Sequence, residues 1–199
     1  MRLALVLLVS ACATYDEHHI ESAWTIDRLG DGADLGCPAG WTTVRLVAVD
    51  PQTPGTRVVD TFPCDAGEGT SSLLPADSYL AWLEVWDGAK VLATTPPTTT
   101  DVTSFNPQLL AAIYVDAGYV TASWPSTSQP VSIAFANGTI TSTTTFDLDA
   151  RGGVIGPLHA GHYEVTARVG SWSETLPVIE IAAPNGLTDL GVLPISDRQ

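Results

Sequence analysis

Hydrophobic and polar residues alternate in short runs along most of the chain, and segment 158–169, LHAGHYEVTARV, shows the pattern most clearly. From Tyr163 to Val169 every second residue is apolar, and the residues between them are polar or charged. Since successive side chains of a strand point to opposite faces, this run predicts a strand with one buried face. No long stretch keeps the i, i+3, i+4, i+7 spacing of an amphipathic helix without a proline, glycine or threonine run that interrupts it. The pattern therefore predicts an all-β chain.

The same pattern occurs a second time, earlier in the chain. Segment 74–85, LPADSYLAWLEV, shares Leu-x-Ala-x-x-Tyr and a final valine with segment 158–169, at an offset of 84 residues (158 minus 74). Each copy opens near a tryptophan, in ESAWTID and in VTASWPS. About seven strands can be recognised in the second copy, and Asn137-Gly138 predicts a hairpin between two of them. We therefore expect two tandem Ig-like β-sandwiches, over residues 23–117 and 118–199.

The run Leu-x-Ala-Gly-x-Tyr-x-Val at residues 158–165 resembles the signature of transthyretin-like, carboxypeptidase-regulatory-like β-sandwich domains. The resemblance implies that Gly161 makes a turn and that Tyr163 begins a central strand. The first copy has Asp77 in place of the glycine and is therefore the more divergent one. Such domains usually act as stabilising or adhesive modules, so the resemblance implies a structural role. A sandwich fold by itself does not determine a function.

The chain begins MRLALVLLVSACAT, in which one arginine precedes an unbroken apolar run and two small residues. This order predicts a signal peptide over residues 1–11, and the apolar run is too short to span a bilayer, which takes about 20 residues as a helix. Val9-Ser10-Ala11-Cys12 resembles the lipobox of bacterial lipoproteins. The resemblance implies that Cys12 is lipidated, becomes the first mature residue and anchors the protein through several acyl chains.

Residues 12–22 are polar and without pattern, and we expect a flexible tether there. Ala13 stands where an aspartate would change the sorting of a lipoprotein, so the resemblance implies the outer membrane of a bacterial cell envelope as the location. The alternatives are an ordinary secretory signal with a chance cysteine and a buried N-terminal strand.

An exported protein lies in a compartment where disulfides persist, which leaves Cys37 and Cys64 as the expected pair. Cys37 precedes the strand-like WTTVRLVAVD, and Cys64 ends the strand-like RVVDTFPC, with the turn PQTPGT between them. A hairpin would bring the two cysteines together, and closing a loop of about 27 residues contributes roughly 3.5 kcal/mol to stability. The alternatives are a reactive thiol pair and a metal site, which no CxxC spacing or nearby histidine favours.

Charge and motifs limit the function classes. The net charge is −14, from 22 acidic and 8 basic residues, so nucleic acid is not an expected partner. The sequence has no Gly-x-Ser-x-Gly, HExxH or phosphate-binding glycine loop, and we expect neither an enzyme nor a cofactor. Asp27, Asp31 and Asp34 lie in DRLGDGADLG, where carboxylates could hold calcium. Their spacing does not match an EF-hand, and a solvated loop is the preferred interpretation.

The segment YLAWLEVW is the most informative candidate site. The register of the second copy places Tyr79, Ala81, Leu83 and Val85 in the core and puts Leu80, Trp82, Glu84 and Trp86 on the opposite face. The two tryptophans would lie about 13 Å apart and could stack on extended sugars, with Glu84 between them as an acceptor. Cover by a loop, by the other domain or by a partner subunit is the alternative.

Together these observations predict a non-enzymatic, envelope-anchored lipoprotein that acts as a structural, adhesive or protein-interaction module. A carbohydrate-binding module that uses Trp82 and Trp86 is the alternative. The expected partners are the membrane, through the lipid, and a protein or glycan of the envelope.

Overall fold

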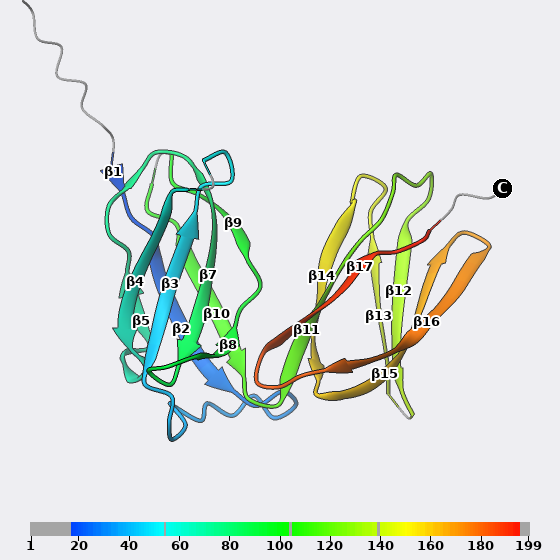
Figure 1. The fold of residues 1–199 in the computed structure, drawn as a ribbon, viewed down its shortest axis with the longest axis horizontal. Coiled ribbons are helices and arrows are strands. Elements are labelled where there is room, and N and C mark those ends of the chain that lie inside the picture. Colours follow the sequence, from blue (N-terminus) through cyan, green and yellow to red (C-terminus); the bar gives the residue numbers. More distant parts are fainter. Residues whose placement is uncertain (1–16, 54, 104, 139, 196–199) are drawn as a thin grey trace, which may run out of the picture.

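The computed structural model describes residues 17–195 except residues 54, 104 and 139, and this part of the chain is built almost entirely from strands (Figure 1). We call its N-terminal strands the first half: β1 (Glu17–His18), β2 (Glu21–Asp27), β3 (Thr43–Val49), β4 (Arg57–Pro63), β5 (Glu68–Thr70), β6 (Leu74–Pro75), β7 (Ser78–Trp86), β8 (Val91–Thr94), β9 (Thr98–Asp101) and β10 (Gln108–Tyr114). The second half consists of β11 (Ala117–Ser123), β12 (Val131–Asn137), β13 (Ile140–Phe146), β14 (Gly152–His159), β15 (Gly161–Val169), β16 (Trp172–Ile181) and β17 (Gly186–Val192). The only helix in the described residues is the short 3-10 helix η1 (Cys64–Ala66). The all-β prediction is confirmed.

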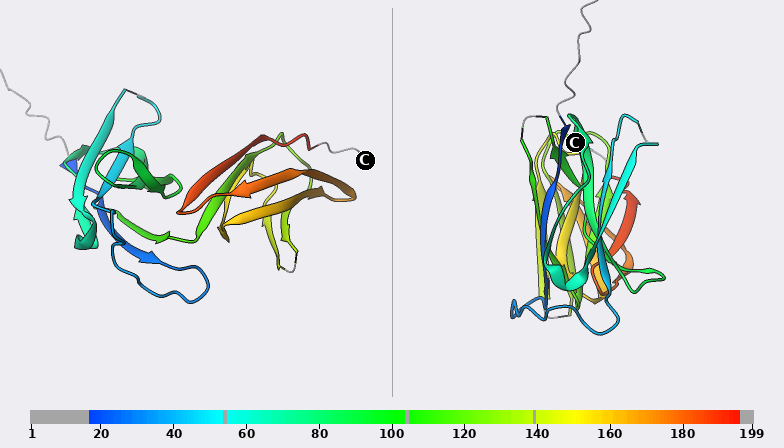
Figure 2. Two further views of the ribbon diagram at one scale, coloured as in Figure 1. Left: turned by 60° about the horizontal axis from the view of Figure 1, so that its bottom comes forward. Right: turned by 90° about the vertical axis from the view of Figure 1, so that its left-hand side faces the viewer.

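Each half is a β-sandwich. In the first half β10, β2 and β5 form one sheet in that order, and β4, β3, β7 and β8 form the other, with β9 also paired to β7. In the second half the orders are β14-β11-β17 and β13-β12-β15-β16. The strands β1 and β6 form a separate pair. The two halves lie next to each other along the long axis and meet where β10 leads into β11 (Figures 1 and 2).

The two halves share one topology. The first long strand of each half pairs in parallel with the last one, β2 with β10 and β11 with β17. The same first strands pair antiparallel with β5 and with β14 on their other side. In the opposite sheets β7 lies beside β3, and β15 lies beside β12. The repeated sequence motif therefore forms the same central strand in both sandwiches.

Two separate hydrophobic clusters fill the halves, one drawn from residues 20–113 and the other from residues 120–195. The residues predicted to face inward in the two copies of the motif are all buried: Tyr79, Ala81, Leu83, Val85, Tyr163, Val165, Ala167 and Val169. Burial of each larger side chain contributes about 1.5–3 kcal/mol. The period-2 pattern thus gives the correct register of both strands.

The glycine of the second motif lies where the resemblance to transthyretin-like domains implied a turn. Gly161 has φ +150° and is the first residue of β15, and Tyr163 follows two residues later. In the first half Asp77 occupies the equivalent position, and its carboxylate accepts a hydrogen bond from the N–H of Ser78 at 2.7 Å. The two equivalent residues therefore lie at the start of the central strand, Gly161 as the first residue of β15 and Asp77 directly before β7.

Each core also contains a tryptophan beside a phenylalanine. The ring centroids of Trp24 and Phe62 are 6.1 Å apart, and those of Trp124 and Phe146 are 4.9 Å apart. Both indole N–H groups donate to backbone carbonyl oxygens, at 3.0 Å and 3.1 Å. Because the donors are satisfied, both tryptophans can be buried without an unpaired polar atom.

Both predicted hairpins are present in the structure. β3 pairs with β4 in continuous antiparallel register, and β12 pairs with β13 across Asn137-Gly138 in the same way. At the end of the first hairpin Cys37 and Cys64 form a disulfide with a Cα–Cα distance of 6.0 Å. The bond ties the loop before β3 to the helix η1 that follows β4.

The tether predicted over residues 12–22 is wrong from residue 17 onward, because β1 begins at Glu17 and β2 begins at Glu21. Ile20 is fully buried in the core of the first half, and its N–H donates to the hydroxyl of Ser71 at 2.9 Å. The N–H of His19 donates to the side chain of Asn106 at 3.1 Å. A single apolar residue among polar ones shows no period, so only the pairing with distant segments reveals the strand.

Candidate functional site

The predicted tryptophan platform lies on the outer face of the sheet β4-β3-β7-β8. Trp82, Glu84 and Trp86 come from β7, and Arg45 and Arg57 come from β3 and β4. We call these five residues the tryptophan network. Arg45 is the direct partner of Glu84 in the β3–β7 ladder, so the basic and acidic side chains share one face of the sheet.

Glu84 bridges the two indoles. Its Oε1 accepts a hydrogen bond from Nε1 of Trp82, and its Oε2 accepts one from Nε1 of Trp86, both at 3.1 Å. Nη2 of Arg57 lies 3.4 Å from Oε1, and the Glu84 side chain is only 11% exposed. Both carboxylate oxygens are thus engaged within the protein and hold the two indoles in place. A role of Glu84 as a hydrogen-bond acceptor for a sugar stays a prediction.

One face of Trp86 is also covered by the protein. The guanidinium carbon of Arg45 lies 3.7 Å from the ring centroid, in cation–π contact. Val47, the ladder partner of Trp82, is completely buried although it belongs to the outward-facing residues of β3. The network therefore acts as a second small layer of packing on this sheet. Sugar stacking on Trp82 and Trp86 stays a prediction.

A buried asparagine joins the two halves. Asn185, in the loop before β17, is fully buried and has a positive φ of 45°. Its side-chain oxygen accepts a hydrogen bond from the N–H of Tyr114 at 3.0 Å, and its side-chain nitrogen donates to the carbonyl of Thr94 at 3.1 Å. Its backbone N–H lies 3.0 Å from the carbonyl oxygen of Tyr114 and 2.7 Å from that of Ala117. One residue of the second half thus holds two strands of the first.

Asp116 makes a second set of contacts between the two halves. A carboxylate oxygen of Asp116 accepts a hydrogen bond from the N–H of Leu29 at 2.8 Å, and the other lies 3.8 Å from Nδ1 of His159. The carbonyl of Asp116 accepts a hydrogen bond from the N–H of Ala160 at 2.9 Å. Asp116, in the short connection between β10 and β11, is therefore bonded to a loop of the first half and to a turn of the second.

Burial at this junction also affects a tyrosine. Tyr119, the third residue of β11, is half-buried, and burial together with the nearby Tyr114 raises its pKa to about 12. Its phenol is consequently neutral over the ordinary range of pH.

The three aspartates proposed for calcium have separate roles. Asp27 accepts a hydrogen bond from the hydroxyl of Thr25 at 2.7 Å, and Asp34 accepts one from the N–H of Gly36 at 2.9 Å. Asp31 lies 3.6 Å from the guanidinium of Arg28. Within residues 17–195 as described, no three His, Cys, Asp or Glu side chains are grouped closely enough to hold a metal ion. The solvated-loop interpretation fits these contacts.

Cys12 and the predicted signal peptide lie outside the described residues. In the part of the chain that the structure describes, no helix has the length and hydrophobicity needed to cross a membrane.

Several residues of these sites could not be recognised from the sequence. Arg45 and Arg57 follow from the strand pairing, since they lie on different strands from the tryptophans. Asn185 could have been noted as a turn residue in Ala-Pro-Asn-Gly, where asparagine tolerates a positive φ. Nothing local indicates that its side chain reaches Thr94, 91 residues away.

Comparison with known proteins gives distant structural likenesses. No protein-family model and no curated protein matches the chain. A candidate adhesin from Bacteroides ovatus superposes with a TM-score of 0.35 and 8% identity, covering 98% of this chain and 96% of that one. The fimbrial anchor protein Mfa2 from Porphyromonas gingivalis has a TM-score of 0.32 and 12% identity, over 75% of this chain and 78% of its own. The Bacillus anthracis TIE protein has a TM-score of 0.34 and 10% identity over 89% of this chain, which spans 34% of the TIE chain. All three TM-scores are low, so these likenesses carry no conclusion about the function or the partners of this chain.

Proposed function

We propose that this chain is a lipoprotein anchored through Cys12 in the bacterial outer membrane, and that its two sandwich domains act as a rigid structural or adhesive module without catalytic activity. The proposal rests on the hydrogen bonds at the junction between the two halves. Asn185 and Asp116 bind both halves through buried or partly buried hydrogen bonds, which favours one fixed arrangement of the two domains over a flexible connection.

The position of the N-terminal strand supports the same role. β1 lies at the side of the first half that faces away from the second half (Figure 1). A lipid attached a few residues before β1 would hold the first half near the membrane and leave the second half farther from it. The carboxylate of Glu84, the charged member of the predicted sugar platform, binds both indoles of that platform, which supports a structural role.

The anchor is tested by comparing the wild type with Cys12→Ser in a bacterial host. We expect the wild type to fractionate with membranes and to carry a lipid-sized increase in intact mass, and both properties to be absent from the variant. A soluble, unlipidated wild type would overturn the anchored part of the proposal.

Surface exposure can be tested through the single lysine. Lys90 is exposed and is the only lysine of the chain, and N-acylation of Cys12 would block the mature N-terminus. A membrane-impermeant amine-reactive biotin added to whole cells should therefore label the protein only at Lys90. Lys90→Arg is the matched control. Labelling of broken cells but not of whole cells would place the module on the periplasmic side.

A further inference from the structure

The strand β10 lies at the edge of its sheet, and its unpaired side has no role in the proposed function. Among the described strands β10 pairs with β2 alone, in a parallel ladder that runs without a register shift from Gln108 to Tyr114. Its sequence, QLLAAIY, contains neither a charged residue nor a proline. A long, uncharged and regular strand at the edge of a sheet is a template for the addition of another strand.

The hydrogen bonds at the two ends of β10 show which backbone groups face away from β2. The carbonyl of Pro107 accepts a bond from the N–H of Glu21, so residue 107 points toward β2. The N–H and carbonyl of Tyr114 bind Asn185 and point the other way. In a parallel ladder successive residues alternate between the two sides. The backbone groups of Gln108, Leu110 and Ala112 are therefore directed at the free edge.

The equivalent strand of the second half is built differently. β17 contains a charged residue, Asp189, whose carboxylate accepts hydrogen bonds from the Thr121 hydroxyl and the Gly191 N–H. Its pairing with β11 is also interrupted by a register shift, and Gly191 has φ +67°. Charges and bulges are the usual devices that protect an edge strand. Within one chain, β17 has both devices and β10 has neither.

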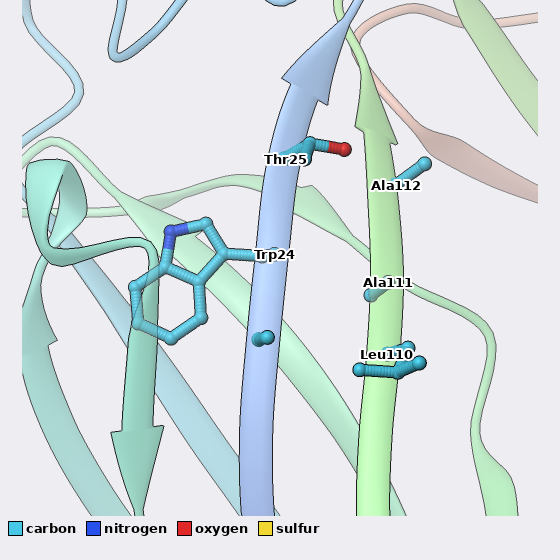
Figure 3. Close-up of a pocket in the computed structure, with 6 residues that line it drawn as sticks. Trp24, Thr25, Leu110, Ala111 and Ala112 are labelled. Carbon is cyan, nitrogen blue, oxygen red and sulfur yellow. The ribbon is translucent and has the colours of Figure 1, made fainter.

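The outer face of the sheet offers room for side chains of an added strand. Leu110, which is 72% exposed, stands beside a shallow hollow of about 310 Å³ between β10 and β2 (Figure 3). Ala23 and Ala112 line this hollow with small side chains, and Thr25 lines it as well. The face is apolar in the middle of the strand, where an added apolar residue would bury the exposed leucine.

Carboxylates stand at both ends of this apolar stretch. Glu21 is the ladder partner of Gln108, and Asp27 is the ladder partner of Tyr114. They are six residues apart on one strand, about 20 Å at 3.3 Å per residue, and lie on the same face because six is even. The strands β10, β2 and β5 also carry Glu68 but no lysine or arginine. A second copy of this chain, at net charge −14, would meet electrostatic repulsion here.

We propose that the free edge of β10 binds an extended segment of a cationic partner protein, which adds a strand to the sheet. The segment has apolar residues at alternate positions and a lysine or arginine at each end, six residues apart, to meet Glu21 and Asp27. The proposal rests on the proposed role as an interaction module and names its partner surface. It does not depend on the lipid anchor.

The test uses the full chain with Cys12→Ser and a fluorescent synthetic peptide, Lys-Thr-Val-Thr-Val-Thr-Lys, whose binding is followed by fluorescence anisotropy. We expect saturable binding that weakens as salt is added. The same peptide with glutamate in place of both lysines should bind at least ten-fold more weakly. Absence of saturable binding of the lysine peptide, or equal binding of the glutamate peptide, overturns the proposal and leaves the anchored module intact.

Two further measurements locate the peptide. Ala112→Pro removes an N–H that points away from β2, so it should abolish peptide binding, while Ala112→Ser keeps the N–H and a small side chain in the hollow and should bind as the wild type does. If the proline variant does not fold, a peptide N-methylated on the side that faces β10 should fail to bind the unaltered Ala112 chain. Undiminished binding of that peptide overturns the proposal. A dimer that Ala112→Pro dissociates would show instead that a second copy occupies the edge.

Discussion

The side-chain amide of Asn185 donates a hydrogen bond to the backbone carbonyl of Thr94 at 3.1 Å, across 91 residues of sequence. Thr94 is the last residue of β8 in the first half, and Asn185 lies in the loop before β17 in the second. Because Asn185 is fully buried, water cannot replace this bond if the halves separate slightly. Opening the junction would leave a buried donor and acceptor unpaired, which costs about 1–3 kcal/mol for each group.

Removing the Asn185 side chain should loosen the junction. Asn185→Gly keeps a residue that tolerates φ 45° and deletes the side chain with its amide. We expect the free energy of unfolding to fall by about 1–3 kcal/mol. In NMR relaxation the halves should have one rotational correlation time in the wild type and two different times in the variant. Asn137→Gly, at an exposed hairpin position, is the control and should leave the correlation time unchanged. A single correlation time in Asn185→Gly would contradict the role of this residue.

Glu84 should be important for stability rather than for binding. Glu84→Gln replaces one carboxylate oxygen with an N–H₂ group, so one of the two indole donors loses its acceptor and Arg57 loses a charged partner. We expect a loss of about 1–3 kcal/mol in urea denaturation. Glu164→Gln, on the exposed face of β15, is the matched control and should change stability by less than about 0.5 kcal/mol. Equal effects of the two substitutions would show that the tryptophan network contributes nothing.

The strand register is the part of the fold that the sequence predicts best. Tyr163 to Val169 alternate strictly, and transfer of this alternation by 84 residues correctly buries Tyr79 and its inward-facing neighbours. Local chemistry also predicts the Asn137-Gly138 hairpin, because only a tight turn fits between the two alternating segments. These features depend on neighbours within a few residues.

The sites depend on contacts between distant segments and were harder to predict. The register of the repeat correctly predicts the face that carries Trp82. It does not reveal the contact of Glu84 with Arg57, since Arg57 lies on another strand at no fixed spacing in the sequence. The sequence predicts a tether at Ile20 because the hydrogen-bond partner of this residue, Ser71, lies 51 residues away along the chain. Contacts between segments so far apart produce no repeating pattern of apolar residues in the sequence.

The two tyrosines of the repeated motif should contribute equally to stability. Tyr79 donates its phenolic hydrogen to the carbonyl of Pro75 at 3.0 Å, and Tyr163 donates to the carbonyl of His159 at 3.0 Å, each four residues earlier. Tyr79→Phe and Tyr163→Phe should each lower the free energy of unfolding by about 1 kcal/mol. The double variant should show the sum, because the two sites lie in separate cores. Clearly unequal losses would mean that the shared geometry does not reflect a shared role.

Reduction of the disulfide should destabilise the first half more than the second. The bond between Cys37 and Cys64 closes a loop of 27 residues, and in the chain-entropy model its removal costs roughly 3.5 kcal/mol. Cys37→Ala combined with Cys64→Ala should lower the melting temperature, and hydrogen exchange should rise mainly in β3 and β4. A uniform rise across both halves would indicate that they unfold as one unit.

Alkali should weaken the fold through Tyr119. Its pKa is raised from 10.0 to about 12 by burial, and Tyr114 adds to the effect. Because the folded-state pKa lies above the unfolded one, the contribution of Tyr119 is complete below pH 10 and is lost as the pH rises toward 12. Burial also raises the pKa of Tyr79, so phenolate absorbance should show late titration, and the late step should be smaller by one tyrosine in Tyr119→Phe. The stability of the variant should also fall less between pH 10 and 12 than that of the wild type. If both proteins lose stability in parallel over that range, the alkaline transition arises from another group.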